Sequence, residues 1–338
     1  MTTNFKVQRF HLQLNMALPL AFAHRCKAGA GRGLSLYTPP PLILNYHNGP
    51  LLTSSSGIPI YLLWYGGFSK SQKQTVADFL RSISPMNSMS TRERTSDEVG
   101  IPAVSTWWNT LTSYKDSGGV GVTPLVRIGG QYTDRACSLG RNLKLADIQN
   151  LVVDSVANAY FPADPAAVYL VLTAFNVFVE GFCVSSCGSH SLVPGSLKTK
   201  NTELLYAWVG NPGTQCPGYC AWPFAVEPFV GPPDFKPLVA PNGDIGADGM
   251  VINVATLLAG TATNPFNTGY YQGVASLPNE AATACLGSFG SGSFPGYPGH
   301  LLTDTVTNAS FNAYGIHSRE FLLPALWDPA SDTCKTLT

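Results

Sequence analysis

Two cysteine units with the same internal spacing are the most chemically informative residues in the sequence. Cys183 and Cys187 are separated by three residues, and so are Cys216 and Cys220. Paired units of this kind hold either a structural zinc ion or disulfide bonds. Structural zinc sites more often use a two-residue spacing, and no histidine follows the second unit at a ligand spacing. The sequence therefore favours disulfides among these four cysteines and leaves their pairing open.

Three side chains outside the cysteine units are candidate catalytic groups. Glu180 and His190 flank the first unit, where a disulfide-bonded loop would aim them at a substrate as a base and its partner. A solvated or hydrogen-bonded pair is the structural alternative. Asp244 lies with Asn242 and Asp248 in a segment whose oxygen atoms could surround calcium, although such residues are also ordinary helix caps. Because the segment lacks the bidentate glutamate of an EF-hand loop, we favour the caps and predict no metal site.

The sequence lacks the short signatures of common catalytic and cofactor-binding loops. It contains no Gly-x-Ser-x-Gly elbow, no His-Glu-x-x-His helix, no Gly-x-x-x-x-Gly-Lys-Ser/Thr loop and no Gly-x-Gly-x-x-Gly fingerprint. We therefore predict no cofactor. Lys plus Arg and Asp plus Glu number 20 each, so the chain has no net charge that would attract nucleic acid.

Apolar runs bounded by turn residues alternate with amphipathic segments along the chain. The run at 58–65 is typical of a buried strand, and a capping box follows at Ser69 and Gln72. Apolar positions at helical spacing then continue until Pro85. The same patterns predict further strands at 123–128, 168–173 and 204–209, and further helices at 104–114, 148–156 and 250–260.

Nearly continuous apolar strands are typical of a sheet that is covered on both faces. We therefore predict an α/β or α+β fold with a mixed, largely buried sheet, packed amphipathic helices and stabilising disulfides. The segment 250–260 is apolar almost all round and is expected in the core. Aromatic rings can form a sugar-stacking platform, but most of the following lie on predicted elements and favour a core position: Trp64, Tyr65, Trp107, Trp108, Trp208, Trp222 and Trp327.

The first residues have the order of regions found in a secretory leader. Two basic residues precede a mostly apolar run at 12–23 that ends in a small-x-small pattern. A signal peptide at 1–23 is the favoured interpretation, and a disordered start is the alternative. Because the residues up to 41 are rich in Pro, Gly and Ser, we expect a leader at 1–41 and a single domain at 42–338.

Two further features agree with export. The chain has 8 cysteines, an even number, as expected in an oxidising compartment. Asn308-Ala309-Ser310 is an N-glycosylation sequon, which predicts a glycan on Asn308. No segment beyond the leader reaches about 18 uninterrupted apolar residues, so we expect no membrane span.

Several segments, in order along the chain, carry a family resemblance. They are YHNGPLLT (46–53), IPIYLLWYGGFSKSQK (58–73), VSTWWNTLTSY (104–114), VYLVLT…VEGFCVSSCGSH (168–190), WVGN…QCPGYCAWPF (208–224), APNGDIGADGMVINVATLLAGTATNPF (240–266) and FLLPALWDP (321–329). These segments resemble the plant EXORDIUM-like, or phosphate-induced, protein family, over 42–338. The resemblance implies secretion to the apoplast and cell wall and a link to brassinosteroid-responsive growth.

The chain departs from the pattern of that family at a few positions. Asn176 stands where the family usually has Asp, and Cys26 and Cys137 are additional cysteines. The resemblance therefore implies three disulfides among the remaining cysteines, which are Cys183, Cys187, Cys216, Cys220, Cys285 and Cys334.

The apolar segment 250–260 also has a weaker resemblance to zinc-metallopeptidase-like proteins. In those proteins a His-Glu pair opens a helix that ends in Thr-Asp-Pro, and this pair would align with Thr256 and Leu257. Neither residue can bind zinc or accept a proton as a base, and Gly260 stands where a further ligand would be needed. The resemblance thus implies a degenerate metallopeptidase-like core that is silent at this site.

Two functional hypotheses of different classes follow. The favoured one is a secreted, non-enzymatic wall protein that promotes growth by binding a cell-wall glycan or a receptor ectodomain. The alternative is a hydrolase of wall glycans or peptides that uses Glu180, His190 and Asp244. Convergent carboxylates or histidines in a pocket would favour the hydrolase, whereas an aromatic groove would favour binding.

Overall fold

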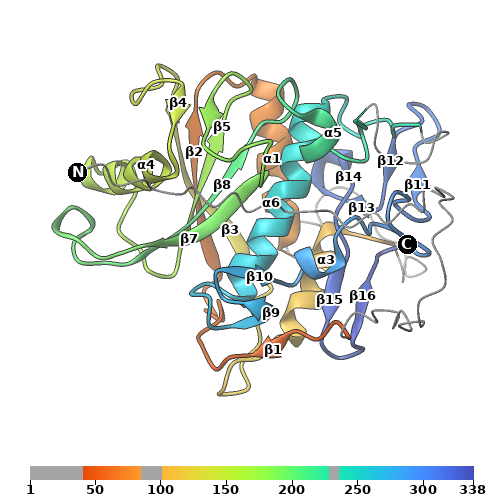
Figure 1. The fold of residues 1–338 in the computed structure, drawn as a ribbon, viewed down its shortest axis with the longest axis horizontal. Coiled ribbons are helices and arrows are strands. Elements are labelled where there is room, and N and C mark those ends of the chain that lie inside the picture. The colour runs from red at the N-terminus through yellow and green to blue at the C-terminus, as the bar shows by residue number, and fades with distance from the viewer. Residues whose placement is uncertain (1–40, 85–100, 228–235) are drawn as a thin grey trace, which may run out of the picture. The chain divides into compact units, whose positions relative to one another are not determined.

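A five-stranded sheet forms the centre of the fold in the computed structural model (Figure 1). The structure describes residues 41–84, 101–227 and 236–338, so the predicted signal peptide, the rest of the leader up to residue 40 and Cys26 lie outside the described residues. The strand order is β3 (Val126–Asp134), β2 (Ile58–Tyr65), β5 (Val168–Thr173), β8 (Leu204–Gly210) and β7 (Gly188–Val193). The first four strands are parallel and β7 is antiparallel to β8, which confirms the predicted mixed sheet.

The sheet is covered by helices on both faces, as Figure 1 shows. Successive side chains of β2 enter different cores, because neighbouring residues of a strand point to opposite faces. Ile60 and Leu62 lie in one core, and Tyr61 and Leu63 lie in the other. The first core is closed by α1 (Lys70–Ile83), α3 (Val104–Asn109) and α6 (Ile245–Thr263), and the second by α4 (Leu145–Ala157).

Helix α6 is apolar on nearly all sides because it lies between the sheet and the C-terminal strands. It is the one helix within the described ranges that is long and apolar enough to cross a membrane, but 78% of its apolar window is buried inside the fold. It begins earlier than the sequence predicted, because the side chain of Asp244 accepts a hydrogen bond from the Ala247 amide and caps the helix. Its first turns are rich in small residues that pack closely: a Cβ atom on Gly249 would lie 2.6 Å from Cβ of Ala221.

Two other boundaries differ from the sequence prediction. The strand expected at 123–128 begins at Val126, since Pro124 has no amide proton for a sheet hydrogen bond. The helix expected at 104–114 divides into α3 and a short 3-10 helix, η1 (Thr110–Ser113).

Short antiparallel pairs hold the remaining described segments. They are β1 (Asn45–Tyr46) and β10 (Leu277–Asn279) on either side of β9 (Tyr270–Val274), β11 (Leu302–Thr303) with β12 (Ser310–Phe311), β13 (Ala313–Tyr314) with β14 (Glu320–Phe321), and β15 (Leu326–Asp328) with β16 (Thr333–Lys335). A parallel pair joins β4 (Asn142–Leu143) to β6 (Phe178–Val179). The short helices are η2 (Leu197–Thr199), α5 (Pro217–Cys220), η3 (Thr283–Cys285) and η4 (Ile316–Ser318).

Three disulfides cross-link the described part of the chain, and two of them join the two cysteine units. The pairs are Cys183 with Cys216, Cys187 with Cys220, and Cys285 with Cys334. The prediction of disulfides among these four cysteines is therefore confirmed. Cys137 is buried and has no disulfide partner among the described residues.

Candidate functional site

The three predicted catalytic residues lie on separate elements. Glu180 is exposed, and its Oε2 accepts a hydrogen bond from the Leu145 amide at 3.4 Å. Asp244 caps α6 and accepts a second bond from Gln72 Nε2 at 2.9 Å. His190 lies on β7 in a different, buried cluster. The structure does not bring the three side chains into one site.

The cluster around His190 lies beside the last turns of α6. His190 Nε2 is 2.9 Å from Glu280 Oε2, and the two side chains are 8% and 7% exposed. Asn264 Nδ2 donates a hydrogen bond to Glu280 Oε1 at 2.7 Å. A Cβ atom on Gly260 would lie 2.4 Å from Glu280 Oε2, so glycine makes room for the carboxylate. Because Gly260 lies 16 residues along α6 from Asp244 (260 − 244), this cluster is about 24 Å from the helix cap.

A groove at the carboxyl edge of the sheet has the composition of a binding site. Its volume is about 480 Å³. One wall is formed by residues that come after β5 in the chain, and the other by residues that come after β8. In open α/β sheets, ligands bind beyond the carboxyl ends of the strands. We call it the aromatic groove, and it is lined by Phe175, Asn176, Phe178, Phe182, Cys183, Thr214 and Gln215.

Covalent and hydrogen bonds fix the two walls of the aromatic groove. Gln215 Nε2 donates to the backbone oxygens of Phe175 and Val177 at 2.9 and 3.0 Å. The disulfide between Cys183 and Cys216 joins the same walls. The groove is therefore held open before any ligand arrives, which reduces the entropy cost of binding.

The side chains of the aromatic groove suit a sugar ring. Phe175 and Phe178 are 43% and 57% exposed, so both offer an apolar face to the solvent. Oδ1 of Asn176 is buried and has no hydrogen-bond partner in the described part of the chain. A buried acceptor of this kind is usually satisfied by a donor, and a sugar hydroxyl would supply one. Apolar faces with a few polar groups that fix orientation are typical of small-ligand sites.

The aromatic residues that the sequence offered as a sugar platform were mainly tryptophans and did not include these phenylalanines. Of those tryptophans, the ones on helices and strands are buried, for example Trp64, Trp108 and Trp208. A usable signal was present, because Phe175 and Phe178 directly follow the predicted strand at 168–173. The position of that strand in a parallel sheet was the information that the sequence alone lacked.

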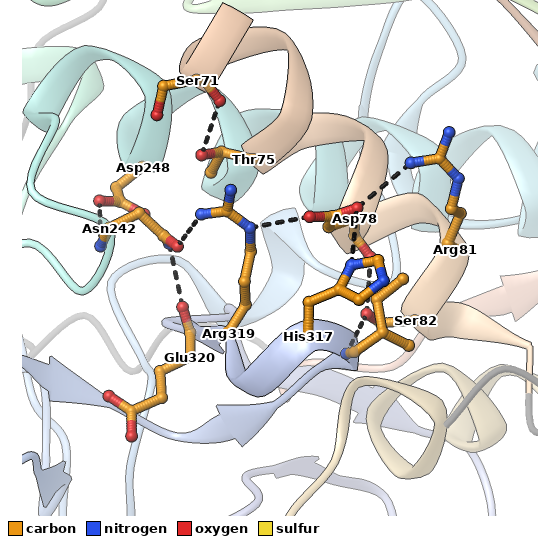
Figure 2. Close-up of polar contacts among 11 residues, drawn as sticks. Ser71, Thr75, Asp78, Arg81, Ser82, Asn242, Asp248, His317, Arg319 and Glu320 are labelled. Atoms are coloured by element: carbon orange, nitrogen blue, oxygen red, sulfur yellow. Dashed lines mark hydrogen bonds and ion pairs between the residues drawn. The ribbon is translucent and has the colours of Figure 1, made fainter. Parts of the chain in front are cut away.

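A second cavity, of about 580 Å³, has charged walls, and we call it the Arg319 pocket. The residues that line it include Gln74, Asn242, Asp304, His317, Arg319 and Glu320. Figure 2 shows Arg319 between Asp78 and Asn242. Nε donates to Asp78 Oδ2 at 2.9 Å and Nη1 donates to Asn242 Oδ1 at 2.7 Å. These bonds join α1 to the start of α6 and to β14.

Asp78 is the centre of the polar network beneath this pocket. Its side chain is 1% exposed and is approached by Arg319, by Arg81 Nη1 at 3.2 Å and by His317 Nδ1 at 3.4 Å. A buried carboxylate needs compensation of this kind, because moving an unpaired charge out of water costs several kcal/mol.

Asp248 is a second buried carboxyl group of the network, and it titrates near neutrality. Burial raises the pKa of Asp248 to about 7, and the hydrogen bonds that it accepts from Asn242 offset part of this shift. Those bonds come from the Asn242 amide and from Nδ2, at 2.9 and 2.7 Å. The segment that resembled a calcium loop is thus occupied by cap and network bonds. No group of three or more His, Cys, Asp or Glu side chains within the described ranges is placed to hold a metal ion.

The two residues that align with the metallopeptidase His-Glu pair, and the predicted glycosylation site, lie in other parts of the fold. Thr256 Oγ1 donates to the Ile252 carbonyl oxygen at 2.9 Å, and Leu257 lies against Gly188 of β7. Asn308 is exposed beside β12, so its side chain is accessible, and its glycosylation stays a prediction.

Comparison with known proteins gives consistent matches over most of the chain. The family model described as the phosphate-induced protein 1 conserved region matches residues 44–337. Protein EXORDIUM-like 2 of Arabidopsis thaliana is 45% identical over 297 residues, which are 88% of this chain and 90% of that protein. Protein PHOSPHATE-INDUCED 1 of Nicotiana tabacum is 43% identical over 328 residues, 97% of this chain and 98% of that protein. Protein EXORDIUM of Arabidopsis thaliana is 46% identical over 302 residues, 87% and 89% of the two chains. No solved structure matches the chain.

Proposed function

The chain belongs to the phosphate-induced protein 1 family, and on that premise we propose that it is a secreted protein of the apoplast and cell wall. It binds a wall glycan in the aromatic groove without changing the glycan chemically. This binding contributes to growth under brassinosteroid control, as its resemblance to the EXORDIUM-like proteins implies.

The observation that carries this proposal is the pair of exposed rings at the carboxyl edge of the sheet. Phe175 and Phe178 lie on either side of Asn176, whose Oδ1 is buried and lacks a partner among the described residues. A sugar ring can place its apolar C–H face on the phenylalanines and donate a hydroxyl hydrogen bond to the amide oxygen. The walls are already fixed by Gln215 and a disulfide, so little ordering is needed on binding.

The composition of the groove also supports binding without catalysis. Its described lining residues are phenylalanine, asparagine, threonine, glutamine and a disulfide-bonded cysteine, none of which exchanges a proton near neutral pH. General acid–base catalysis requires a titratable group within hydrogen-bond reach of the reacting atom. Glu180, His190 and Asp244 lie on separate elements and have partners of their own.

Export is supported by the disulfides and by the sequon. Three structural disulfides are expected in an oxidising compartment and are rare in the cytosol. Expression of the full-length chain with a C-terminal tag tests the proposed export. The tagged chain should appear in the apoplast and wall fractions and should carry a glycan on Asn308. Retention of the tagged chain in the cytosol would contradict it.

The proposed glycan binding is tested by a screen of the purified full-length chain against cello-, xylo- and galacturono-oligosaccharides. Binding of each oligosaccharide and release of shorter products from it are measured in the same screen. We expect saturable binding of at least one series and no shortening of any oligosaccharide. Shortened products would support the hydrolase instead. Absence of binding in all three series would contradict the proposal.

A further inference from the structure

The Arg319 pocket presents charges of both signs and is separate from the aromatic groove. Arg319 and Glu320 are neighbours in the chain and both line it. Figure 2 shows that the Glu320 carboxylate points away from the Arg319 guanidinium. The pocket therefore has a cationic end and an anionic end, and its volume of about 580 Å³ lies in the range of pockets that take drug-sized ligands.

At the cationic end, the guanidinium of Arg319 is fixed and still has a free donor group. Nε and Nη1 are used by Asp78 and Asn242, whereas Nη2 has no partner in the described ranges. The guanidinium of Arg319 shares the carboxylate of Asp78 with that of Arg81, so Asp78 does not neutralise Arg319 alone. A planar donor group in a fixed position is well suited to a carboxylate.

At the anionic end, Asp304 and Glu320 both line the pocket. Asp304 Oδ1 accepts three hydrogen bonds, from the amides of Val306 and Thr307 and from Thr307 Oγ1, which leaves Oδ2 available. Burial and the charge of Asp304 together raise the pKa of Glu320. A cation placed between the two side chains would relieve this repulsion and would favour the ionised form of Glu320.

We propose that the Arg319 pocket binds a short peptide with free ends, whose carboxylate lies on Nη2 of Arg319 and whose ammonium group lies between Asp304 Oδ2 and Glu320. An acidic sugar would satisfy only the arginine and would add to the repulsion at the other end. A metal ion would use only the carboxylates. A single amino acid is small for the volume of the pocket, so a peptide of a few residues fits both charge and size.

Calorimetric titration of the full-length chain with trialanine tests the proposal. The matched ligands are N-acetyl-trialanine, which lacks the ammonium group, and trialanine amide, which lacks the carboxylate. We expect trialanine to bind, and we expect blocking of either end to weaken binding about tenfold or more. Equal binding of the three peptides, or no binding of trialanine at millimolar concentration, would overturn the proposal.

Two substitutions locate the ammonium end. Asp304→Asn keeps the Oδ1 acceptor of the turn and removes the charge, and Glu320→Gln is isosteric. Each should weaken trialanine about tenfold but leave binding of N-acetyl-trialanine unchanged. Glu203→Gln, which changes an exposed carboxylate before β8, is the matched control and should have no effect. Unchanged trialanine affinity in both pocket variants would contradict the assignment, as would a loss of the same size for the acetylated peptide.

Discussion

Arg319 donates a hydrogen bond from Nε to Asp78 Oδ2 across 2.9 Å and joins two segments that are 241 residues apart in the chain. Asp78 lies on α1, and Arg319 directly precedes β14. The same guanidinium lines the Arg319 pocket, so one arginine serves both the stability of the fold and the charge of the pocket. Tests of ligand binding are therefore better made at Glu320 and Asp304, and tests of stability at Asp78.

Replacement of Asp78 by Ala should destabilise the fold strongly. The substitution removes the buried anionic partner of Arg319, whose own side chain is 19% exposed. Removing one partner of a buried pair costs about 3–5 kcal/mol. Urea denaturation of the purified chain measures the change. The control is Asp154→Ala, which breaks the exposed pair of Asp154 with Lys198 and should cost less than about 1 kcal/mol. Equal losses in the two variants would contradict a central role for Asp78.

The stability of the fold should depend on pH through Asp248. Its pKa is raised to about 7 in the folded state, above the value of about 3.9 in an unfolded chain. The folded state therefore binds a proton that the unfolded state has lost. This contribution is fully present below about pH 4 and is lost as pH rises towards 7, with a slope of at most about 1.4 kcal/mol per pH unit.

The variant Asp248→Asn isolates this effect, because its side chain does not titrate. The free energy of unfolding of wild type minus that of the variant, measured between pH 4 and pH 8, should fall as pH rises and level off above 7. A difference that stays constant over this range would show that Asp248 has an ordinary pKa.

Replacement of Gly260 by Ala should destabilise the chain, although alanine is the better helix former. Helix propensity alone would stabilise the variant by about 1 kcal/mol. The new Cβ would lie 2.4 Å from Glu280 Oε2, and Glu280 is held by His190 and Asn264 and cannot easily move. Overpacking of this kind costs about 1–3 kcal/mol.

Thermal or urea denaturation of Gly260→Ala shows directly whether the substitution lowers or raises the free energy of unfolding. Gly67→Ala is the control, since a Cβ atom there would meet nothing within 4 Å. An increase in stability for Gly260→Ala would mean that the cluster around Glu280 is loose.

Peptide mapping without reduction should recover Cys183 linked to Cys216, Cys187 to Cys220 and Cys285 to Cys334. Joint replacement of Cys187 and Cys220 by Ser should cost about 2–5 kcal/mol, because the bond restricts the unfolded chain. A linkage of Cys183 to Cys187, or free thiols at these positions, would contradict the pairing.

The sequence predicted the central sheet well because its strands are buried on both faces. Every residue of β2 and of β5 is buried, so the apolar runs at 58–65 and 168–173 were unambiguous. The capping box at Ser69 was visible for a different reason, since it depends only on residues close together in the sequence. The family resemblance was likewise readable, because it rests on ordered segments and not on contacts.

The candidate site was harder to predict because it depends on which strands are neighbours. Asn176 and Gln215 follow β5 and β8, and only the pairing of these strands brings them to one groove. The partner of His190 could not be found from spacing, because Glu280 is 90 residues away in the chain. In the same way, nothing near Asp78 in the sequence indicates that Arg319 is its ion-pair partner.

The contribution of a single exposed ring to the affinity of the protein for a wall oligosaccharide tests the central claim most directly. Phe178→Ala and Phe294→Ala remove rings of nearly equal exposure, 57% and 58%, but only Phe178 lies in the aromatic groove. The measurement is the Kd of each purified variant for the cello-, xylo- or galacturono-oligosaccharide that the wild-type chain binds most tightly. We expect Phe178→Ala to weaken binding about tenfold and Phe294→Ala to leave it unchanged. Unchanged binding by Phe178→Ala, or an equal loss in the two variants, would contradict glycan binding in the aromatic groove.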